Sequence, residues 1–321
     1  METCILTIAG SDPSAGAGIQ ADMKTAASLG CYAASAITCV TSQNTTDFYM
    51  SEAVDPELVS SQIASVLADM PVAAIKVGML GSEHVVAAVA RALADARKAN
   101  PALPIVIDPV LAATTQGKDG VQARQELARA LVRDLIPLAT LLTPNLPEAR
   151  LLAEAASMVM RGREVDDERP LAAPPEATEQ VMAGWAARIL IAAGASSVLV
   201  KGGHGLDEST CTDLLFCGQE AEHITVHGNC ADNADFSVDL EVPSLDAYVR
   251  TPVAYSARRC EGEFHGTGCV LSAAIACGLA TGLSLPDAVG LGHAHLQELL
   301  GQPLDLGHGS HLIDHFSNPV A

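Results

Sequence analysis

Short apolar runs alternate along the chain with longer Ala- and Leu-rich stretches whose apolar residues recur at helical spacing. The short runs indicate buried strands, because most of them end in Gly, Pro, Asn or Asp, where a strand gives way to a loop. The predicted strands cover residues 4–10, 33–40, 73–80, 104–110, 139–145 and 196–203. The predicted helices cover residues 19–30, 56–70, 84–99 and 179–194. This repeated strand–loop–helix order predicts an α/β protein with a mostly parallel sheet that is covered by helices on both faces.

Two segments interrupt the alternation. Residues 157–178 are charged and Pro-rich, which predicts a surface excursion. Residues 205–264 contain a plausible hairpin at 211–228 and then an irregular acidic stretch, and we interpret them as a flap or insertion beside the site. No internal repeat is present, so we predict a single domain over residues 1–321.

The composition agrees with this fold class. Hydrophobic residues make up 49% of the chain and aromatic residues only 3%, so Ala, Val, Leu and Ile must fill the core. Such a mixture suits helices packed on a buried parallel sheet better than an aromatic-rich β sandwich.

Charge and cysteine usage narrow the class of protein. The formal net charge of −20, without a run of basic residues, argues against a nucleic-acid-binding protein, which needs a basic stripe. The nine cysteines are scattered singly and are expected to be reduced thiols. The first residues lack the basic region of a signal peptide, and no apolar run reaches the roughly 18 residues of a membrane span. We therefore expect a soluble, cytoplasmic protein without a membrane partner.

Polar and Gly-rich clusters follow the predicted strands. Ligands of open α/β sheets bind beyond the carboxyl ends of the strands, so these clusters mark the predicted site. The clusters read GSDPSAGAG, TSQNTTD, GMLGS, DPV, TPNLPEA and KGGHG. Their convergence on one edge of the sheet is a stronger signal than any one of them alone.

The stretch HGTGC at residues 265–269 is the strongest candidate for an anion-binding and catalytic site. A Gly-rich turn that opens a helix directs unpaired backbone N–H groups at one point, and the helix dipole adds positive potential, which suits a phosphate or an oxyanion. The same field is expected to lower the pKa of the Cys269 thiol and make it a candidate base or nucleophile. The pattern fits equally well a small buried cysteine at a helix start, with glycines that serve only packing.

Three charged residues follow other strands. Lys201 precedes two glycines and can reach a phosphate as a point charge, although an exposed lysine without a role has the same pattern. Asp108 and Glu148, with Asn145 ahead of Glu148, suit Mg²⁺, which takes one or two carboxylates and substrate phosphates. However, an Asp before Pro and a Glu at a helix start are also common for purely structural reasons, without any metal. Lys76, in IKVGM, receives no role.

The N-terminal loop matches neither common nucleotide-binding fingerprint. Its G-x-G lacks the third glycine of G-x-G-x-x-G, and no GxxxxGK[ST] loop occurs in the chain. Its small residues instead let a flat ligand approach the backbone. Gln43 and Asn44, at the end of the second predicted strand, offer paired donors and acceptors for a heterocycle, or they cap a turn.

With these loops assembled, the chain resembles the hydroxymethylpyrimidine/phosphomethylpyrimidine kinases of thiamine biosynthesis, in the ribokinase-like superfamily. The matching stretches follow the family's order along the chain up to residue 316. They read TIAGSDPSAGAGIQADMKT, AITCVTSQNT, IKVGMLGS, VIDPV, LLTPNLPEA, VLVKGGH, HGTGCVLSAAIACGLATG and LGHGSHLIDHF.

The resemblance implies a three-layer α/β/α fold and an ATP- and Mg²⁺-dependent kinase that acts on 4-amino-5-hydroxymethyl-2-methylpyrimidine and then on its monophosphate. It also implies a homodimer. In the family picture, Cys269 is the catalytic residue and Lys201 steadies the transferring phosphoryl group. The other implied roles are pyrimidine binding by Gln43, Ala17, Met79 and Val110, Mg²⁺ binding by Asp108 and Glu148, cofactor binding by Asn145, and an anion hole made by Gly266, Thr267, Gly268 and Cys269.

The chain departs from the family pattern in three places. Ala15 replaces a glycine of the opening loop, residues 111–122 lack a short Ser-Gly turn and a leucine pair, and the segment before HGTGC is longer and more acidic. Two other functions therefore stay open. One is a pyridoxine/pyridoxal kinase, a close relative in which a few pocket residues decide the substrate. The other is a catalytically silent pyrimidine-binding regulator.

Overall fold

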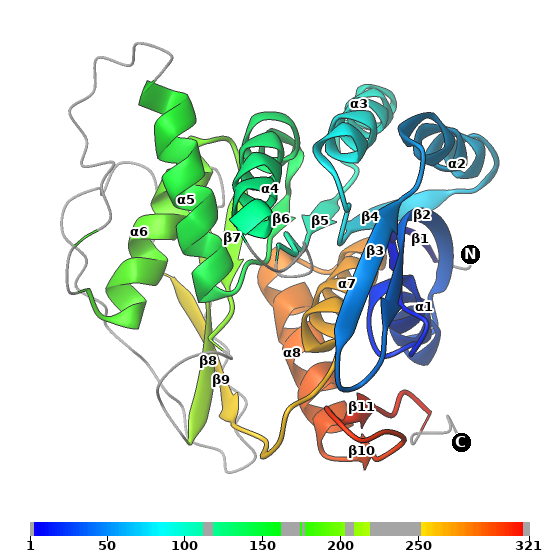
Figure 1. Cartoon of the computed structure of the whole chain (residues 1–321), viewed down its shortest axis with the longest axis vertical. Helices are drawn as coiled ribbons and strands as arrows, with labels where there is room; N and C mark the ends of the chain where they lie inside the picture. Colours follow the sequence, from blue (N-terminus) through cyan, green and yellow to red (C-terminus); the bar gives the residue numbers. More distant parts are fainter. Residues whose placement is uncertain are drawn as a thin grey trace.

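The computed structural model of the chain describes residues 3–111, 118–161, 174, 177–202, 209–218 and 252–316. Its strands are β1 (Cys4–Ser11), β2 (Tyr32–Gln43), β3 (Phe48–Ala53), β4 (Val72–Val77), β5 (Ile105–Ile107), β6 (Leu141–Leu142), β7 (Ser197–Val200), β8 (Thr210–Cys217), β9 (Val253–Arg258), β10 (Pro303–Leu304) and β11 (Leu312–Ile313). Strands β1 to β9 form one sheet in the order β3-β2-β1-β4-β5-β6-β7-β8-β9, and β10 and β11 form a separate ribbon (Figure 1). Neighbours from β2 to β7 in this order are parallel, whereas β3 and β8 are antiparallel to their neighbours.

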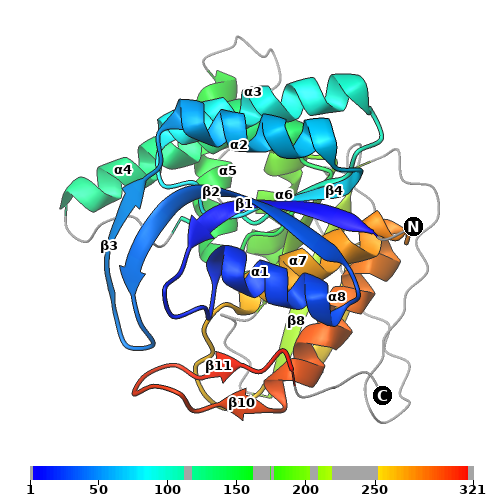
Figure 2. The ribbon, with the colours of Figure 1, turned by 90° about the vertical axis from the view of Figure 1, so that its right-hand side faces the viewer.

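Helices cover both faces of this sheet, as Figure 2 shows. One face carries α2 (Pro56–Asp69), α3 (Glu83–Ala99), α4 (Lys118–Ala130), α5 (Leu146–Arg161) and α6 (Glu179–Ala192), with the short turns η1 (Leu131–Leu135) and η2 (Ile136–Leu138) after α4. The other face carries α1 (Gly18–Ser28), α7 (Thr267–Ala280) and α8 (Leu285–Leu300). The three layers confirm the predicted α/β/α fold class.

The central strands are mostly apolar because both of their faces are buried. In β1, Leu6 and Ile8 point into the core beneath α2 and α3, whereas Ile5 points into a smaller core beneath α1 and α7. In β4, Ile75 joins the first core and Ala74 the second. The period of two along each strand therefore decides which layer of helices a side chain meets.

Helix α7 is apolar around its whole circumference because it packs on the sheet, on α1 and on α8. Residues 270–278 are all buried. Its close approach to α8 depends on glycine: a Cβ on Gly292 would lie 2.8 Å from Cγ1 of Ile275. Packing therefore holds α7 firmly, and with it the turn at residues 266–269 that begins the helix.

The parallel strands deliver their following loops to one edge of the sheet. β1 leads into the loop before α1, β2 ends at Gln43, and Met79 follows β4. Asp108 directly follows β5, and Lys201 directly follows β7. This edge is where the sequence predicts the ligand site.

The predicted strands and helices are confirmed, although the strands from β4 onward are shorter than predicted. The residues beyond Val77, Ile107, Leu142 and Val200 already belong to loops at the site edge. The strand β3 and the helices α4, α5 and α8 were not predicted. β3 is mostly exposed, and Ser51 and Glu52 interrupt its apolar residues, so it lacks the continuous apolar run by which the other strands were found.

Two predicted boundaries need correction. The predicted flap or insertion at 205–264 contains β8 and β9, which extend the central sheet beyond β7 and pair antiparallel with each other. The predicted hairpin at 211–228 begins in β8, but residues 219–251 lie outside the described part of the chain. The predicted excursion at 157–178 begins too early, because α5 continues to Arg161, and most of the rest lies outside the described residues.

Across the part of the chain that the structure describes, no helix combines the length and apolar character needed to span a bilayer.

We expect Ile75→Ala to lower the free energy of unfolding by about 2–5 kcal/mol, because it empties a fully buried position in the core between β4 and the helices above it. Leu58→Ala is the matched control: Leu58 is an exposed residue of α2, and its truncation should cost less than about 0.5 kcal/mol. Urea unfolding followed by circular dichroism measures both values. Equal losses in the two variants would contradict this placement of the core.

Candidate active site

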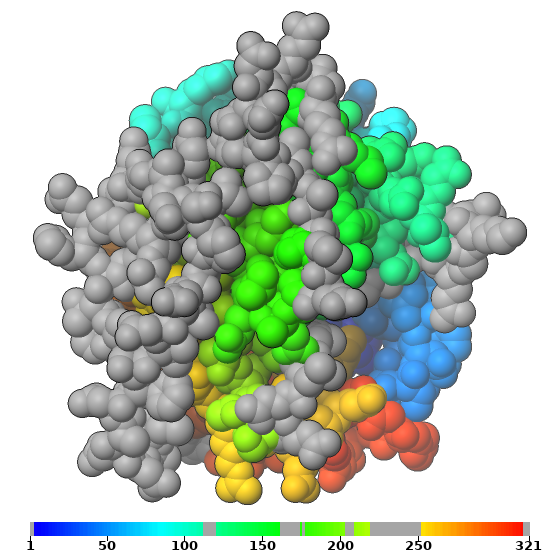
Figure 3. Space-filling view, turned by 90° about the vertical axis from the view of Figure 1, so that its left-hand side faces the viewer, coloured from blue at the N-terminus to red at the C-terminus, as the bar shows by residue number. Residues whose placement is uncertain are grey.

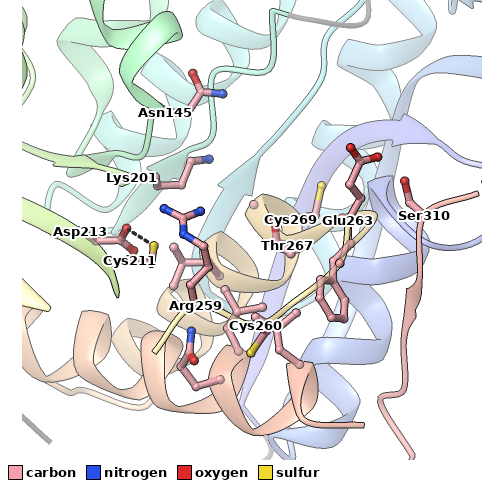
Figure 4. A pocket seen from close by; sticks show the side chains of 18 of the residues that line it. Asn145, Lys201, Cys211, Asp213, Arg259, Cys260, Glu263, Thr267, Cys269 and Ser310 are labelled. Carbon is pink, nitrogen blue, oxygen red and sulfur yellow. Dashed lines mark hydrogen bonds between the residues drawn. The ribbon is translucent and has the colours of Figure 1, made fainter. Parts of the chain in front are cut away.

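A cavity of about 700 Å³ lies at the edge of the sheet where the parallel strands end. It brings together nine of the residues selected from the sequence, from the loops after β5, β6 and β7 and from the start of α7. Figure 4 shows Lys201 and Asn145 on one side of it and Thr267 and Cys269 on the other. The nine are Asp108, Val110, Asn145, Glu148, Lys201, Gly266, Thr267, Gly268 and Cys269.

The side chain of Lys201 reaches the turn that begins α7. Its Nζ lies 2.7 Å from Oδ1 of Asp108, and its backbone N–H donates to the Pro144 carbonyl at 2.9 Å. A Cβ on Gly268 would lie 3.0 Å from this Nζ and 3.3 Å from Oδ2 of Asp108. Glycine at this position therefore lets the backbone of the turn touch the ion pair. A cation, a carboxylate and the N–H groups of a helix start meet at one point.

Asn145 and Glu148 cap α5 reciprocally. The Glu148 N–H donates to Oδ1 of Asn145 at 2.8 Å, and the Asn145 N–H donates to Oε2 of Glu148 at 3.0 Å. Burial raises the pKa of Glu148 above its usual value, Lys201 opposes this effect, and the charge of Asp108 adds to it. The two acids are therefore close enough to repel each other.

The acids of the cavity fit a magnesium ion that is held mainly by phosphate oxygens and water. Within the described residues, no three His, Cys, Asp or Glu side chains are grouped so that they could hold a metal ion by themselves. Mg²⁺ needs only one or two carboxylates when phosphates supply other oxygens. Asp108 and Glu148 line the same cavity as Lys201, and this shared position is the observation that fits a cation held there with phosphate oxygens.

Gly266 joins the turn before α7 to the loop after β1. It is the N-cap of α7 and has a φ of 86°, in the left-handed region that favours glycine. A Cβ on Gly266 would lie 1.9 Å from the carbonyl oxygen of Gly16. The two glycine-rich loops therefore touch backbone to backbone, and the position of one determines the position of the other.

The carboxylate of Asp12 holds these two loops together. It accepts the backbone N–H groups of Gly16 and Ala17 at 3.0 and 2.8 Å, and Nε2 of His265 lies 2.9 Å from Oδ2. Burial favours a higher pKa, but the bonds from His265, Ser14 and Ala17 outweigh it and hold the pKa of Asp12 at about 2. Neither Asp12 nor His265 could be given a role from the sequence, because the partners are 253 positions apart. The one local signal is Asp two residues before Ser, an arrangement that commonly forms a turn.

The thiol of Cys269 lies where two helices begin. It belongs to the first turn of α7, and it accepts a hydrogen bond from the N–H of Gly18, the first residue of α1. Burial nevertheless raises the pKa of this thiol to about 11, although Lys76 and the Gly18 N–H lower it. The expectation of a lowered pKa is therefore wrong for this structure, because the loss of hydration outweighs the fields of the helix starts.

Three residues implied for pyrimidine binding do not line this cavity but lie at its β1 side. Ala17 is the N-cap of α1, Gln43 is the last residue of β2, and Met79 follows β4; β2 and β4 are the two neighbours of β1. Nε2 of Gln43 donates to Oγ1 of Thr41 at 3.0 Å. A Cβ on Gly10 would lie 2.7 Å from the sulfur of Cys39 and 3.7 Å from that of Met79, so β1 packs tightly against this group. The fourth residue, Val110, lines the cavity itself.

The C-terminal residues pack against both ends of the site. The N–H of Ser310 donates to the Thr45 carbonyl at 2.9 Å, beyond Gln43, and the N–H of His265 donates to the His311 carbonyl at 3.0 Å. In Figure 3 the yellow segment before α7 and the red C-terminal segment lie next to each other at the lower edge. Residues 303–313 therefore bridge the loop after β2 and the turn before α7.

Part of the cavity wall comes from residues that no sequence motif indicated. Asp213 of β8 accepts the N–H of Gly202 at 2.8 Å and so orders the residue after Lys201. Leu271 of α7 and Leu296 of α8 supply apolar surface. These residues were missed because β8 and α8 were not recognised as parts of the framework.

We expect Gly266→Ala to destabilise the protein more than Gly282→Ala. Both glycines have a positive φ, 86° and 89°, so alanine is strained at each by about 1–2 kcal/mol. At Gly266 the new Cβ also meets the Gly16 carbonyl at 1.9 Å, whereas nothing lies within 4 Å at Gly282. The overlap should add about 1–3 kcal/mol, measured by urea unfolding. Equal losses would mean that the two loops do not touch.

Known proteins resemble the chain over nearly its whole length. The family model described as phosphomethylpyrimidine kinase matches residues 12–235 and 247–314. The chain is 37% identical over 319 residues to the hydroxymethylpyrimidine/phosphomethylpyrimidine kinase of Rhizobium meliloti (strain 1021), with 98% of each chain covered. The pyridoxal kinase from Staphylococcus aureus in complex with AMP-PCP and pyridoxal is a structural neighbour with a TM-score of 0.72 and 26% identity, covering 98% of this chain and 94% of that one.

A phosphomethylpyrimidine kinase from Clostridium difficile 630 is also similar in structure. Its TM-score is 0.61 at 27% identity, and the match covers 92% of this chain and 99% of that one. The order of the sheet, its two helix layers and these neighbours identify the fold as ribokinase-like. Fold, motifs and near-complete coverage agree, and the chain belongs to the phosphomethylpyrimidine kinase family of phosphotransferases.

Proposed function

We propose that the chain transfers the γ-phosphoryl group of ATP to 4-amino-5-hydroxymethyl-2-methylpyrimidine and then to the resulting monophosphate, a reaction sequence of thiamine biosynthesis. The name of its Rhizobium meliloti relative supports both activities. The observation that carries the proposal is the contact of the Lys201–Asp108 ion pair with Gly268 at the start of α7. This contact places a cation, a carboxylate and the N–H groups of a helix start around one point, and a transferring phosphate needs such groups.

Lys201 and the turn at residues 266–269 stabilise the charge of the transferring group. Phosphoryl transfer spreads negative charge over the phosphate oxygens, and the protein contributes mainly position and electrostatic stabilisation. The first N–H groups of α7 have no acceptor within the helix, so they are available to those oxygens. Burial disfavours the charge of Lys201, but Asp108 and Glu148 outweigh it and raise its pKa, so the side chain is a cation.

Asp108 and Glu148 are the residues that would hold Mg²⁺, together with phosphate oxygens of ATP. Bound there, the ion neutralises charge on the phosphates. Asn145 lines the same cavity, and we propose that it contacts the nucleotide. The AMP-PCP bound to the Staphylococcus aureus neighbour supports a nucleotide ligand for this fold.

Cys269 is the residue that we propose to take a proton from the substrate. In the first step the Cys269 thiol loses its proton to solvent, the hydroxymethyl oxygen forms a bond to the γ-phosphorus as the bond from that phosphorus to ADP breaks, and the hydroxyl proton passes to the Cys269 thiolate. In the second step the acceptor is a phosphate oxygen, which carries no proton that must be removed at neutral pH. The two steps therefore share Lys201 but differ in their need for Cys269.

The pyrimidine itself is proposed to lie at the β1 side of the cavity. Gln43 presents an amide at the end of β2, and Met79 presents a thioether in the loop after β4. Ala17 and Val110 complete the proposed pocket. Hydrogen bonds from an amide and apolar contact from the thioether suit an aminopyrimidine.

We further propose that the enzyme acts as a homodimer in the cytoplasm. The family resemblance suggests the dimer, and exposed apolar side chains on β2 and β3 (Val40, Tyr49 and Met50) support it. The proposed use of ATP as a substrate supports the cytoplasmic location.

Turnover on three substrates in parallel tests the proposed function. The aminopyrimidine alcohol and its monophosphate should both release ADP from Mg²⁺-ATP, and pyridoxal should react more slowly. Faster turnover of pyridoxal would assign the chain to the alternative represented by the Staphylococcus aureus neighbour. Tight pyrimidine binding without ADP release would indicate a regulator instead of an enzyme.

We expect Cys269→Ala to reduce phosphorylation of the alcohol by about 10²-fold or more and to change phosphorylation of the monophosphate much less, because only the alcohol loses a proton. Steady-state kcat for each substrate measures the difference. Lys201→Ala is the comparison variant and should slow both steps by a similar factor, since both transfer the same charge. Equal losses on both substrates in Cys269→Ala would contradict the role as base.

A further inference from the structure

Arg259 lines the same cavity as Lys201 and the turn that begins α7, but neither the sequence motifs nor the proposed mechanism uses it. It directly follows β9, and its backbone N–H donates to the Ser209 carbonyl at 3.0 Å, which continues the pairing of β9 with β8 by one residue. Its side chain is partly exposed. In Figure 4 the guanidinium points into the cavity, on the side where Lys201 and Asp213 lie.

The register of β8 and β9 places the Arg259 side chain on the face of the sheet that carries α7 and α8. Tyr255 of β9 is opposite Asp213 of β8, and it packs with residues of those two helices. Ala257 is opposite Cys211. Side chains alternate along a strand, so Arg259 projects to the same face as Tyr255 and Ala257. Cys211 is then its diagonal neighbour, and such neighbours lie about 7–8 Å apart, within reach of a long side chain.

A chain of contacts leads from Cys211 to Lys201. Sγ of Cys211 lies 3.9 Å from Oδ1 of Asp213, and the same oxygen accepts the N–H of Gly202 at 2.8 Å. Gly202 also touches β8 with its backbone, because a Cβ there would lie 2.0 Å from the Thr212 carbonyl oxygen. The paired strands β8 and β9 are therefore fixed relative to Lys201, the residue directly before Gly202.

The charges that line the cavity are on balance negative. The described residues of its wall include four acids and three cations. Lys201 is already bonded to Asp108 at 2.7 Å. Arg258 is exposed and alternates to the opposite face of the paired strands, although it also borders the cavity. Arg259 is therefore the cation best placed to act together with Lys201 on an anionic ligand. The acids are Asp108, Glu148, Asp213 and Glu263, and the cations are Lys201, Arg258 and Arg259.

We propose that Arg259 binds phosphate oxygens of the nucleotide, as a second cation beside Lys201. Its guanidinium presents N–H donors in a planar fork that fits a phosphate through two parallel hydrogen bonds, whereas the lysine acts as a point charge. The inference rests on the proposed function for the presence of a nucleotide. It concerns the affinity for that nucleotide and is independent of which alcohol receives the phosphoryl group.

The test is the affinity of the full-length protein for Mg²⁺-ADP, measured by titration calorimetry, with adenosine as the probe that lacks phosphates. Arg259→Ala should weaken the binding of Mg²⁺-ADP by about tenfold or more, because it removes hydrogen bonds between a cation and an anion. The binding of adenosine should stay the same. Arg259→Lys should recover part of the lost affinity, since it keeps the charge but not the planar fork.

Two results would overturn the proposal. An unchanged affinity of Arg259→Ala for Mg²⁺-ADP would mean that the guanidinium does not contact the phosphates. An equal loss of affinity for adenosine would mean that Arg259 supports the base, the ribose or the shape of the cavity instead. Arg259→Gln keeps most of the length of the side chain and removes its charge, so it gives the same test if Arg259→Ala fails to fold.

Arg258→Ala is the matched control, because it removes the same charge one residue away, from the exposed side of the paired strands. It should weaken the binding of Mg²⁺-ADP by less than about threefold, since solvent screens an exposed charge. A loss equal to that of Arg259→Ala would indicate only the general field of the cavity and would contradict the proposal. If the natural chain binds Mg²⁺-ADP through Arg259 but phosphorylates no pyrimidine, the proposed function fails and the role of Arg259 stands.

Discussion

The hydrogen bonds of the Asp12 carboxylate are the constraint on which the site depends. This side chain organises its own loop and reaches His265 at the start of the HGTGC turn, so that Gly16 and Gly266 meet through their backbones. The contact leaves no space for a side chain on either residue, since a Cβ on Gly16 would collide with the ring of His265. It decides where α7 begins and therefore where the free N–H groups of that helix point. Every role proposed for the turn presupposes this junction.

The distribution of charge shows how an acidic protein can receive phosphates. The net charge of −20 repels anions at long range, but its effect on a partly buried site is weaker than that of groups in contact. Within the site, Lys201 is paired with Asp108, which keeps the lysine charged and fixed beside the turn that begins α7. The positive potential is therefore local.

Much of the framework could be predicted because it depends on local patterns. The apolar runs of β1 and β4 to β7 report burial on both faces, and Asp108 and Lys201 follow from the rule that site residues lie at strand ends. What could not be predicted depends on distant partners. The sequence places β8 in a hairpin of a flap or insertion, and its pairing with β7 and β9 is known only from the sheet. Likewise, Lys76 meets Asp22, 54 positions away, only in the folded protein. The pKa of Cys269 was misjudged because burial is a property of the whole fold.

The ribbon formed by residues 303–313 has a consequence for biosynthesis. It supplies the carbonyl that receives the His265 N–H, while Asp12, which holds the His265 ring, precedes that histidine by 253 positions. The turn between them is thus secured from both directions only after residue 311 has left the ribosome. Earlier segments can assemble the sheet as they emerge, but a nascent chain has no complete phosphate cradle until then.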